Sequence, residues 1–331
     1  MYFSMKKNQL IILVALLTFG ANLAQTYNAG YRSFQLKDST RTYKPNTEQT
    51  DKLHYRPVDL DIWYPSNDKK ASALKFGNLF NLFEQRAVNY QDTEDYSGIT
   101  NELAQFYVAQ LGVGADGQQL LNIETNSFLD LEPSPSKHPV IIYMAGFNGM
   151  GFENYKILEA LAQNGFLVVS VWSVGRYPGD MTNQKEDMLE QVYDAEFAMR
   201  YLKENNLFNA DFNTIGIIGY SWGGMSSAVF IDRNPNTKAF VSLDGTETHY
   251  FGEEDENDRF IQEILDSNLL DPETQPIKYL YLESGDKLDG FQPSKDYNYF
   301  RELNFEKYYL RFKKGVHADF MCIPSILEAS K

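Results

Sequence analysis

The chain has 331 residues, 43% of them hydrophobic, and a formal net charge of −15 at pH 7. This composition supplies a large buried core and excludes an intrinsically disordered protein. The acidity argues against a nucleic acid partner, because an acidic surface repels a phosphate backbone.

The N-terminus has the pattern of an export signal. Lys6 and Lys7 precede the apolar stretch QLIILVALLTFGA, which is short for a membrane span, and small residues near Ala24 provide a cleavage site. We therefore expect residues 1–24 to be a signal peptide, with an uncleaved membrane anchor as the alternative. The mature protein would be periplasmic or secreted, without stable membrane insertion. The single cysteine, Cys322, excludes an intrachain disulfide.

No linker divides residues 25–331, so we expect a single domain. Alternating polar and apolar residues at 31–38 and 57–65 predict half-buried edge strands. The segment 66–135 that follows carries helical patterns and is predicted to be an insertion that forms a lid or a pocket wall. Its aromatic side chains would either line an acyl pocket or pack against the sheet: Phe76, Phe80, Phe83, Phe106 and Tyr107.

From residue 139 onward, short apolar runs alternate with helical patterns. The runs predict strands at 139–146, 166–172, 214–221, 239–245, 277–286 and 307–315. Helical spacing appears at 153–165, at 185–206 and from the third run to about Arg233. Apolar strands separated by helices indicate an α/β fold with a mostly parallel sheet and helices on both faces.

The sequence GYSWGG places Ser221 where a predicted strand passes into a predicted helix. A serine on such a turn projects from the carboxyl end of the strand, and the start of the helix offers free N–H groups beside it. We interpret Ser221 as a nucleophile. The oxyanion would be bound by the N–H of Trp222 and by one N–H of the turn MAGFNGMG, from Phe147 or, alternatively, Asn148.

The motifs LDIWYPS, PVIIYMAGFNG, GFLVVSV, GYSWGG, AFVSLDG and GVHADF follow one another along the chain. Over about residues 55–325 the chain thereby resembles the α/β-hydrolases, and within them the dienelactone hydrolase and platelet-activating-factor acetylhydrolase branch. The resemblance implies an α/β-hydrolase fold and hydrolysis of a small-molecule ester without metal or cofactor. Ala145 and Tyr220 stand where this branch has histidines, which changes the pocket rim but removes no backbone donor.

In α/β-hydrolases the catalytic histidine follows the last strand, and His317 meets this position. The other histidines lie elsewhere: His54, His138 and His249. Many members place the acid after the penultimate strand, where Asp286 stands, whereas the acetylhydrolase-like branch places it one strand earlier, where Asp244 stands. We predict Asp244, with Asp286 as the alternative, because a carboxylate at the end of an apolar strand needs a partner such as the imidazole.

Two further patterns carry less weight. GVGADG at 112–117 lacks the preceding strand that a dinucleotide site requires. The acidic residues of 252–260 suit the first turn of a helix, with a calcium site as the alternative. The sequence thus predicts an exported serine esterase. The alternatives are an exopeptidase or acyltransferase with the same triad, and an inactive hydrolase fold that binds a ligand; no pattern fixes the oligomeric state.

Overall fold

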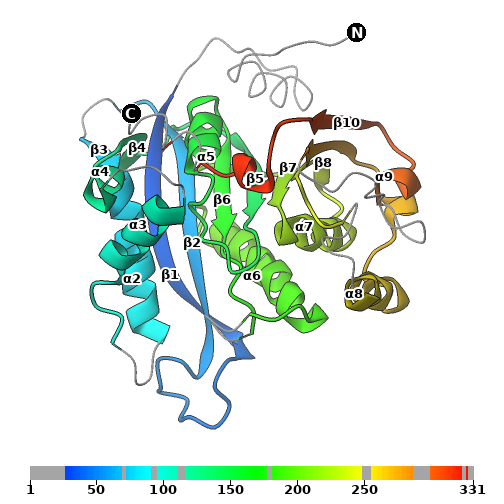
Figure 1. Cartoon of the computed structure of the whole chain (residues 1–331), viewed down its shortest axis with the longest axis horizontal. Coiled ribbons are helices and arrows are strands. Elements are labelled where there is room, and N and C mark those ends of the chain that lie inside the picture. Colours follow the sequence, from blue (N-terminus) through cyan, green and yellow to red (C-terminus); the bar gives the residue numbers. More distant parts are fainter. Residues whose placement is uncertain are drawn as a thin grey trace.

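The computed structural model describes residues 27–68, 72–90, 95–110, 116–176, 181–247, 255–285, 299–322 and 326. Its centre is a ten-stranded sheet with the strand order β10-β9-β8-β7-β5-β6-β2-β1-β4-β3 (Figure 1). From β6 to β10 all neighbouring strands are parallel, whereas β2 runs antiparallel to both β1 and β6. The predicted fold class is confirmed.

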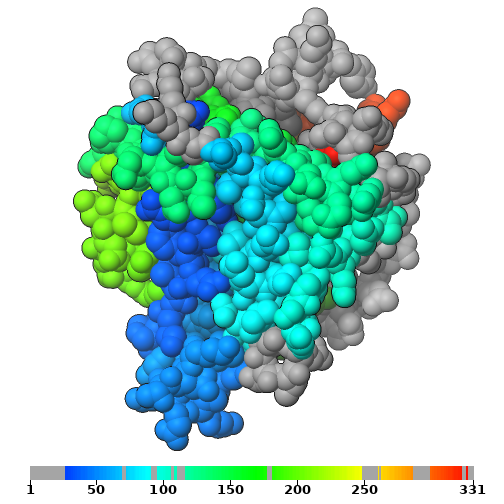
Figure 2. Space-filling model, turned by 90° about the vertical axis from the view of Figure 1, so that its left-hand side faces the viewer, coloured from blue at the N-terminus to red at the C-terminus, as the bar shows by residue number. Residues whose placement is uncertain are grey.

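The first two strands, β1 (Asn28–Thr42) and β2 (Tyr55–Ser66), form a long antiparallel hairpin. The insertion supplies the predicted helices and, in addition, two strands that extend the sheet beyond β1. Its elements are β3 (Ala73–Lys75), α2 (Phe76–Tyr90), α3 (Ile99–Gln110), α4 (Gly117–Leu121) and β4 (Glu124–Leu129). Figure 2 shows these helices, in cyan and teal, on the flank beside the blue hairpin, whose end projects past them.

The C-terminal half alternates strands and helices as predicted. The strands are β5 (His138–Met144), β6 (Leu167–Val171), β7 (Ala210–Tyr220), β8 (Thr237–Leu243), β9 (Lys278–Ser284) and β10 (Lys307–Phe312). The helices are α5 (Tyr155–Gln163), α6 (Lys185–Glu204), α7 (Trp222–Arg233), α8 (Asp255–Asp266) and α9 (Tyr299–Glu302). Short 3-10 helices are η1 (Pro272–Thr274) and η2 (His317–Phe320).

The core lies on both faces of the sheet because successive side chains of a strand point to opposite faces. In β5, Val140 and Ile142 pack into the cluster with α6, α7 and α8. Ile141 and Tyr143 pack into the other cluster, with α2, α3 and α5. Among the described residues, no helix is both long and apolar enough to cross a bilayer.

The topology brings two turns together at one edge of the sheet. β5 lies between β6 and β7. After β5 the chain crosses over to β6 on one side of β5, and after β6 it crosses back to β7 on the other side. Ligands of open α/β sheets bind outside the carboxyl ends of the strands at such a point. The turn after β5 and the turn after β7 both lie there.

Candidate active site

Ser221 lies alone between the last residue of β7 and the first residue of α7, with φ 53° and ψ −122°. A positive φ is uncommon for a residue with a side chain and marks a strained turn. The backbone is held there by neighbouring segments, since the N–H of Ser221 donates to Leu243 O (3.1 Å) and its C=O accepts the N–H of Thr246 (3.1 Å). A Cβ on Gly223 would lie 2.2 Å from Met144 O, so glycine is required where the helix meets β5.

Asp244 and His317 are in direct contact. The Nδ1–H of His317 donates to Asp244 Oδ2 at 2.7 Å. The carboxylate is fully buried and also accepts the backbone N–H of Ser284 (2.9 Å) and its hydroxyl (2.7 Å). Three donors thus fix the carboxylate, and the Nδ1–H contact leaves Nε2 of the imidazole as the proton acceptor.

Tyr220 connects the histidine to the serine turn. Its ring stacks on the His317 imidazole, with centroids 4.9 Å apart and an interplanar angle of 21°. Its hydroxyl donates to the carbonyl of His317 (3.3 Å). Because Tyr220 immediately precedes Ser221, this packing brings Ser221, His317 and Asp244 into one region at the carboxyl ends of β7 and β8.

Several backbone N–H groups of the turn after β5 donate hydrogen bonds to nearby acceptors. Gly146 donates to Glu153 Oε1 (2.8 Å), Asn148 to the Met181 sulfur (3.4 Å) and Gly149 to Gly146 O (2.8 Å). Of the four described residues 146–149, Phe147 is the one whose N–H has no acceptor within the turn or its neighbours. This distribution favours Phe147 over Asn148 as the oxyanion donor.

The N–H of Trp222 is the candidate donor on the serine side. It belongs to the first turn of α7, where backbone N–H groups have no partner within the helix. The Trp222 ring packs edge-on against Phe147 (5.6 Å between centroids) and stacks on Phe260 (4.9 Å). Phe147 itself is 40% exposed, so an aromatic surface borders the two donors.

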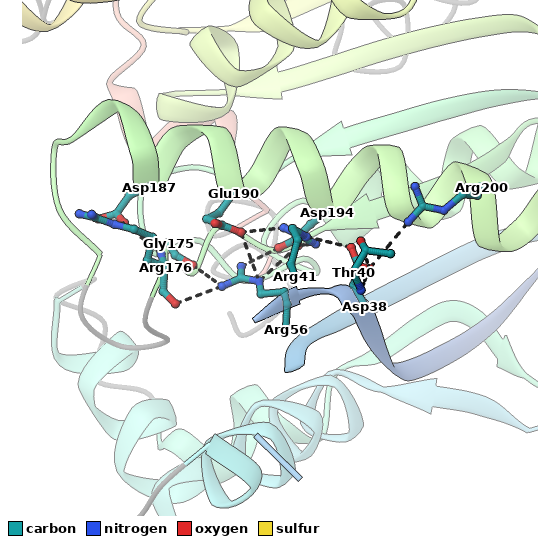
Figure 3. A network of polar contacts seen from close by, with 10 residues as sticks. All are labelled: Asp38, Thr40, Arg41, Arg56, Gly175, Arg176, Asp187, Glu190, Asp194 and Arg200. Carbon is teal, nitrogen blue, oxygen red and sulfur yellow. Dashed lines mark hydrogen bonds and ion pairs between the residues drawn. The ribbon is translucent and has the colours of Figure 1, made fainter. Parts of the chain in front are cut away.

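The segment after β6 is tied to the sheet by a network of ion pairs (Figure 3). Arg56 donates to Asp194 (2.7 Å) and to the carbonyl of Gly175 (2.6 Å). Arg41 contacts the same carboxylate (2.5 Å) and Glu190 (2.6 Å). The network joins the β1–β2 hairpin to α6 and fixes the chain where it leaves β6.

Asp187 of α6 continues this anchoring toward the turn after β5. Its carboxylate accepts hydrogen bonds from the guanidinium of Arg176 (2.6 Å) and from the backbone N–H of Thr182 (2.8 Å). Met181, next to Thr182, is thereby held where its sulfur accepts the Asn148 N–H. The chain following β6 therefore helps to shape the turn after β5.

The insertion is anchored to the same region through buried charges. Arg86 of α2 donates to both oxygens of Asp61 (3.1 and 3.0 Å), and the indole N–H of Trp172 donates to the same carboxylate (2.6 Å). A Cβ on Gly151 would lie 2.4 Å from the Trp172 nitrogen, so the chain that follows the turn after β5 packs directly on this group. Helix α2 is therefore joined to the segment after β5 through the buried Asp61 carboxylate and Trp172.

The aromatic residues of the insertion are predicted either to line an acyl pocket or to pack against the sheet. Phe76 and Phe80 are buried and pack on one another and on aromatic side chains near the start of α5, as ordinary core residues. Phe83 stacks on Trp172 (6.2 Å). The side chains of Phe106 and Tyr107 lie outside the described residues.

The remaining residues singled out in the sequence lie either away from the site or outside the residues that the structure describes. His54 bonds to Thr47 O and His138 to Gly165 O, both as structural contacts (2.9 Å each). His249, Asp286, the signal segment 1–24 and residues 252–254 of the acidic run lie outside the described residues, whereas residues 255–260 of that run begin helix α8. Among the residues described, no group of acidic, histidine or cysteine side chains could hold a metal ion.

Sequence reasoning missed four contributors to this geometry: Glu153, Met181, Ser284 and the Arg86–Asp61 pair. Only Glu153 gives a local signal, a carboxylate four residues beyond a glycine turn and just before a helix. The others act through contacts between distant segments, which no local pattern reports.

Comparison with known proteins agrees with the fold. The profile of the dienelactone hydrolase family matches residues 127–259, which include both turns and Asp244. The structure resembles that of a ferulic acid esterase from Streptomyces cinnamoneus, with a TM-score of 0.61 over 93% of this chain and 80% of the esterase chain. The two chains are 18% identical, so this likeness concerns the fold. No protein of curated function matches the chain in sequence. The family match over this part of the chain and the architecture together support an α/β-hydrolase fold similar to that of the dienelactone hydrolases, and an ester hydrolase activity.

Proposed function

We propose that this protein is an exported serine esterase that works through an acyl-enzyme on Ser221. The observation that carries the proposal is the 2.7 Å hydrogen bond between His317 and the buried Asp244, beside the strained turn that presents Ser221. A buried carboxylate, an imidazole and a serine gathered at one edge of the sheet are the parts that acyl transfer requires.

The chemistry follows from these contacts. Ser221 Oγ attacks the ester carbonyl while His317 Nε2 takes its proton, and Asp244 stabilises the resulting imidazolium through Nδ1–H. The N–H groups of Trp222 and Phe147 donate to the oxyanion. His317 then protonates the departing alcohol, and a water molecule, deprotonated by the same imidazole, releases the acid. Every step uses residues of this chain, so we propose that neither metal nor cofactor takes part.

The substrate class is proposed from the surroundings of the two donors. The exposed ring of Phe147, which packs on the buried ring of Trp222, offers an aromatic surface beside the reacting carbonyl, and this suits an ester with an apolar or aromatic group. The solved neighbour is a ferulic acid esterase, so methyl ferulate belongs beside short p-nitrophenyl esters among the test substrates.

Export remains part of the proposal on the evidence of the sequence. The basic start, the short apolar stretch and the small residues near Ala24 fit a cleaved signal. N-terminal sequencing of the protein recovered from the periplasm or medium would test it, and an N-terminus at Met1 would contradict it.

A fluorophosphonate probe tests the proposed nucleophile. We expect the wild type to be labelled and Ser221→Ala to remain unlabelled, with Ser226→Ala as the matched control, because Ser226 is buried in the same helix. Labelling of Ser221→Ala equal to the wild type would refute the assignment. Hydrolysis of aminoacyl-anilides in preference to p-nitrophenyl esters would favour a peptidase.

A further inference from the structure

Glu153 lies between α5 and the turn at residues 146–149, which we call the oxyanion turn, and its side chain folds back under that turn. Oε1 accepts the N–H of Gly146 (2.8 Å) and the hydroxyl of Tyr143 (2.7 Å). Oε2 occupies the inside of the turn, where a Cβ on Gly149 would approach it to 2.6 Å. The carboxyl group therefore fills the space that the glycine leaves open.

The bond to Gly146 fixes one of two consecutive peptide planes. The 145–146 peptide is held at both ends, since Gly146 N–H donates to Glu153 and Ala145 O accepts Gln191 Nε2 (3.0 Å). In the next peptide, Gly146 O accepts the Gly149 N–H inside the turn (2.8 Å). A trans peptide directs its N–H opposite to its C=O, so the N–H of Phe147 points out of the turn.

Glu153 also contacts the chain that follows His317. Its carbonyl accepts the N–H of Cys322 (3.0 Å), two residues after η2 ends. A single residue thus joins the oxyanion turn to the segment carrying the proposed base. Burial raises the pKa of Glu153 to about 7, with hydrogen bonds from Tyr143 and Gly146 opposing that rise.

We propose that Glu153 is a positioning residue for the oxyanion hole, holding Gly146 so that the Phe147 N–H faces the reacting carbonyl. This inference rests on the proposed function. Its action is through a side-chain oxygen that accepts a hydrogen bond. A protonated carboxyl group keeps one such oxygen, and so does the amide of glutamine.

Steady-state kinetics with p-nitrophenyl acetate test the proposal on four variants. Glu153→Leu should lower kcat by about 10- to 100-fold, because loss of one oxyanion donor is felt chiefly in the transition state. Its KM should stay within about twofold. Glu153→Gln should keep kcat within about threefold, since it retains the acceptor. Glu153→Asp, whose oxygens are withdrawn by one methylene, should behave as the leucine variant and serves if that variant does not fold.

Glu159→Leu is the matched control for lost stability. Glu159 is a buried carboxylate like Glu153, but it lies within α5 and accepts from Asn126 and Ser127 of β4, away from the turn. We expect its kcat per folded molecule to be unchanged. Three results would overturn the proposal: wild-type kcat in folded Glu153→Leu or Glu153→Asp, an equal loss in Glu159→Leu, or failure of Glu153→Gln to retain activity.

Failure of this inference is separable from failure of the proposed function. An inactive Ser221→Ala beside a fully active Glu153→Leu would leave the serine mechanism intact and remove only the role of Glu153. Turnover by Ser221→Ala equal to the wild type would instead contradict the function on which the inference rests.

Discussion

Replacing Asp244 by asparagine changes the proton pattern of the proposed triad with minimal change in shape. The wild-type carboxylate accepts from His317 Nδ1 (2.7 Å) and from the N–H (2.9 Å) and hydroxyl (2.7 Å) of Ser284. The N–H of Ser284 requires an oxygen at Oδ1, so the amide nitrogen of asparagine would stand at the position facing His317. It donates rather than accepts, and the imidazole must then carry its proton on Nε2.

The size of the effect follows from that tautomer. An imidazole protonated on Nε2 cannot take the proton of Ser221, and the partner that stabilised the imidazolium is lost. The corresponding aspartate-to-asparagine change in the serine-protease triad, a case described for that family, lowers kcat by about 10⁴. We expect a fall of about 10³- to 10⁴-fold here, equivalent to about 4–5.5 kcal/mol of transition-state stabilisation.

The assay compares kcat of Asp244→Asn and Asp286→Asn on p-nitrophenyl acetate, with circular dichroism confirming that both variants fold. Asp286→Asn is the matched comparison because it stands at the alternative acid position. The account predicts a large loss for Asp244→Asn and a small one for Asp286→Asn. If Asp244→Asn turns over within tenfold of the wild type while Asp286→Asn is inactive, the acid has been assigned to the wrong residue.

Three other substitutions give distinct outcomes. Ser284→Ala removes one of the three donors to Asp244, and kcat on p-nitrophenyl acetate should fall by about 10- to 100-fold, as loss of a hydrogen bond to a charged group implies; an unchanged kcat would count against it. Burial raises the pKa of Glu153 to about 7, so wild-type stability should decrease as the pH rises from about 4.5 to about 7. Glu153→Gln lacks this ionisation. Its free energy of unfolding in urea, relative to that of the wild type, should therefore increase by up to about 3 kcal/mol between pH 4.5 and pH 8. A difference that stays constant with pH would contradict the raised pKa of Glu153. Arg86→Met leaves Asp61 charged and buried, and should destabilise the fold by about 3–5 kcal/mol in urea unfolding with little change in kcat of the folded fraction; unaltered stability would show that the pair is dispensable.

Apolar runs between residues 139 and 315 were sufficient to predict the parallel sheet, because a strand covered on both faces needs no alternation and stands out in composition. The strand β3 spans Ala73–Lys75 and β4 spans Glu124–Leu129. Both are short and lie within a helical segment, so neither has a pattern strong enough to identify it. Their strand character comes from pairing with each other and with β1.

The residues of the candidate site likewise fall into those with a local sequence signal and those without one. Ser221 and His317 could be proposed from the chain because a turn between strand and helix, and a loop after the last strand, leave local marks. Ser284 and Met181 carry no such mark, since their roles depend on reaching Asp244 and Asn148 from other segments. The Arg86–Asp61 contact likewise joins residues 25 positions apart on different elements.

Trapping the acyl-enzyme tests the central claim most directly. An excess of a slowly deacylating p-nitrophenyl ester is mixed with the enzyme, the reaction is quenched in acid, and the digested protein is examined by mass spectrometry. The account predicts a burst of about one p-nitrophenol per enzyme molecule, with the acyl group on the peptide that contains Ser221 and on no peptide of Ser221→Ala. Turnover without a burst, or an acyl group on another residue, would contradict covalent catalysis by Ser221.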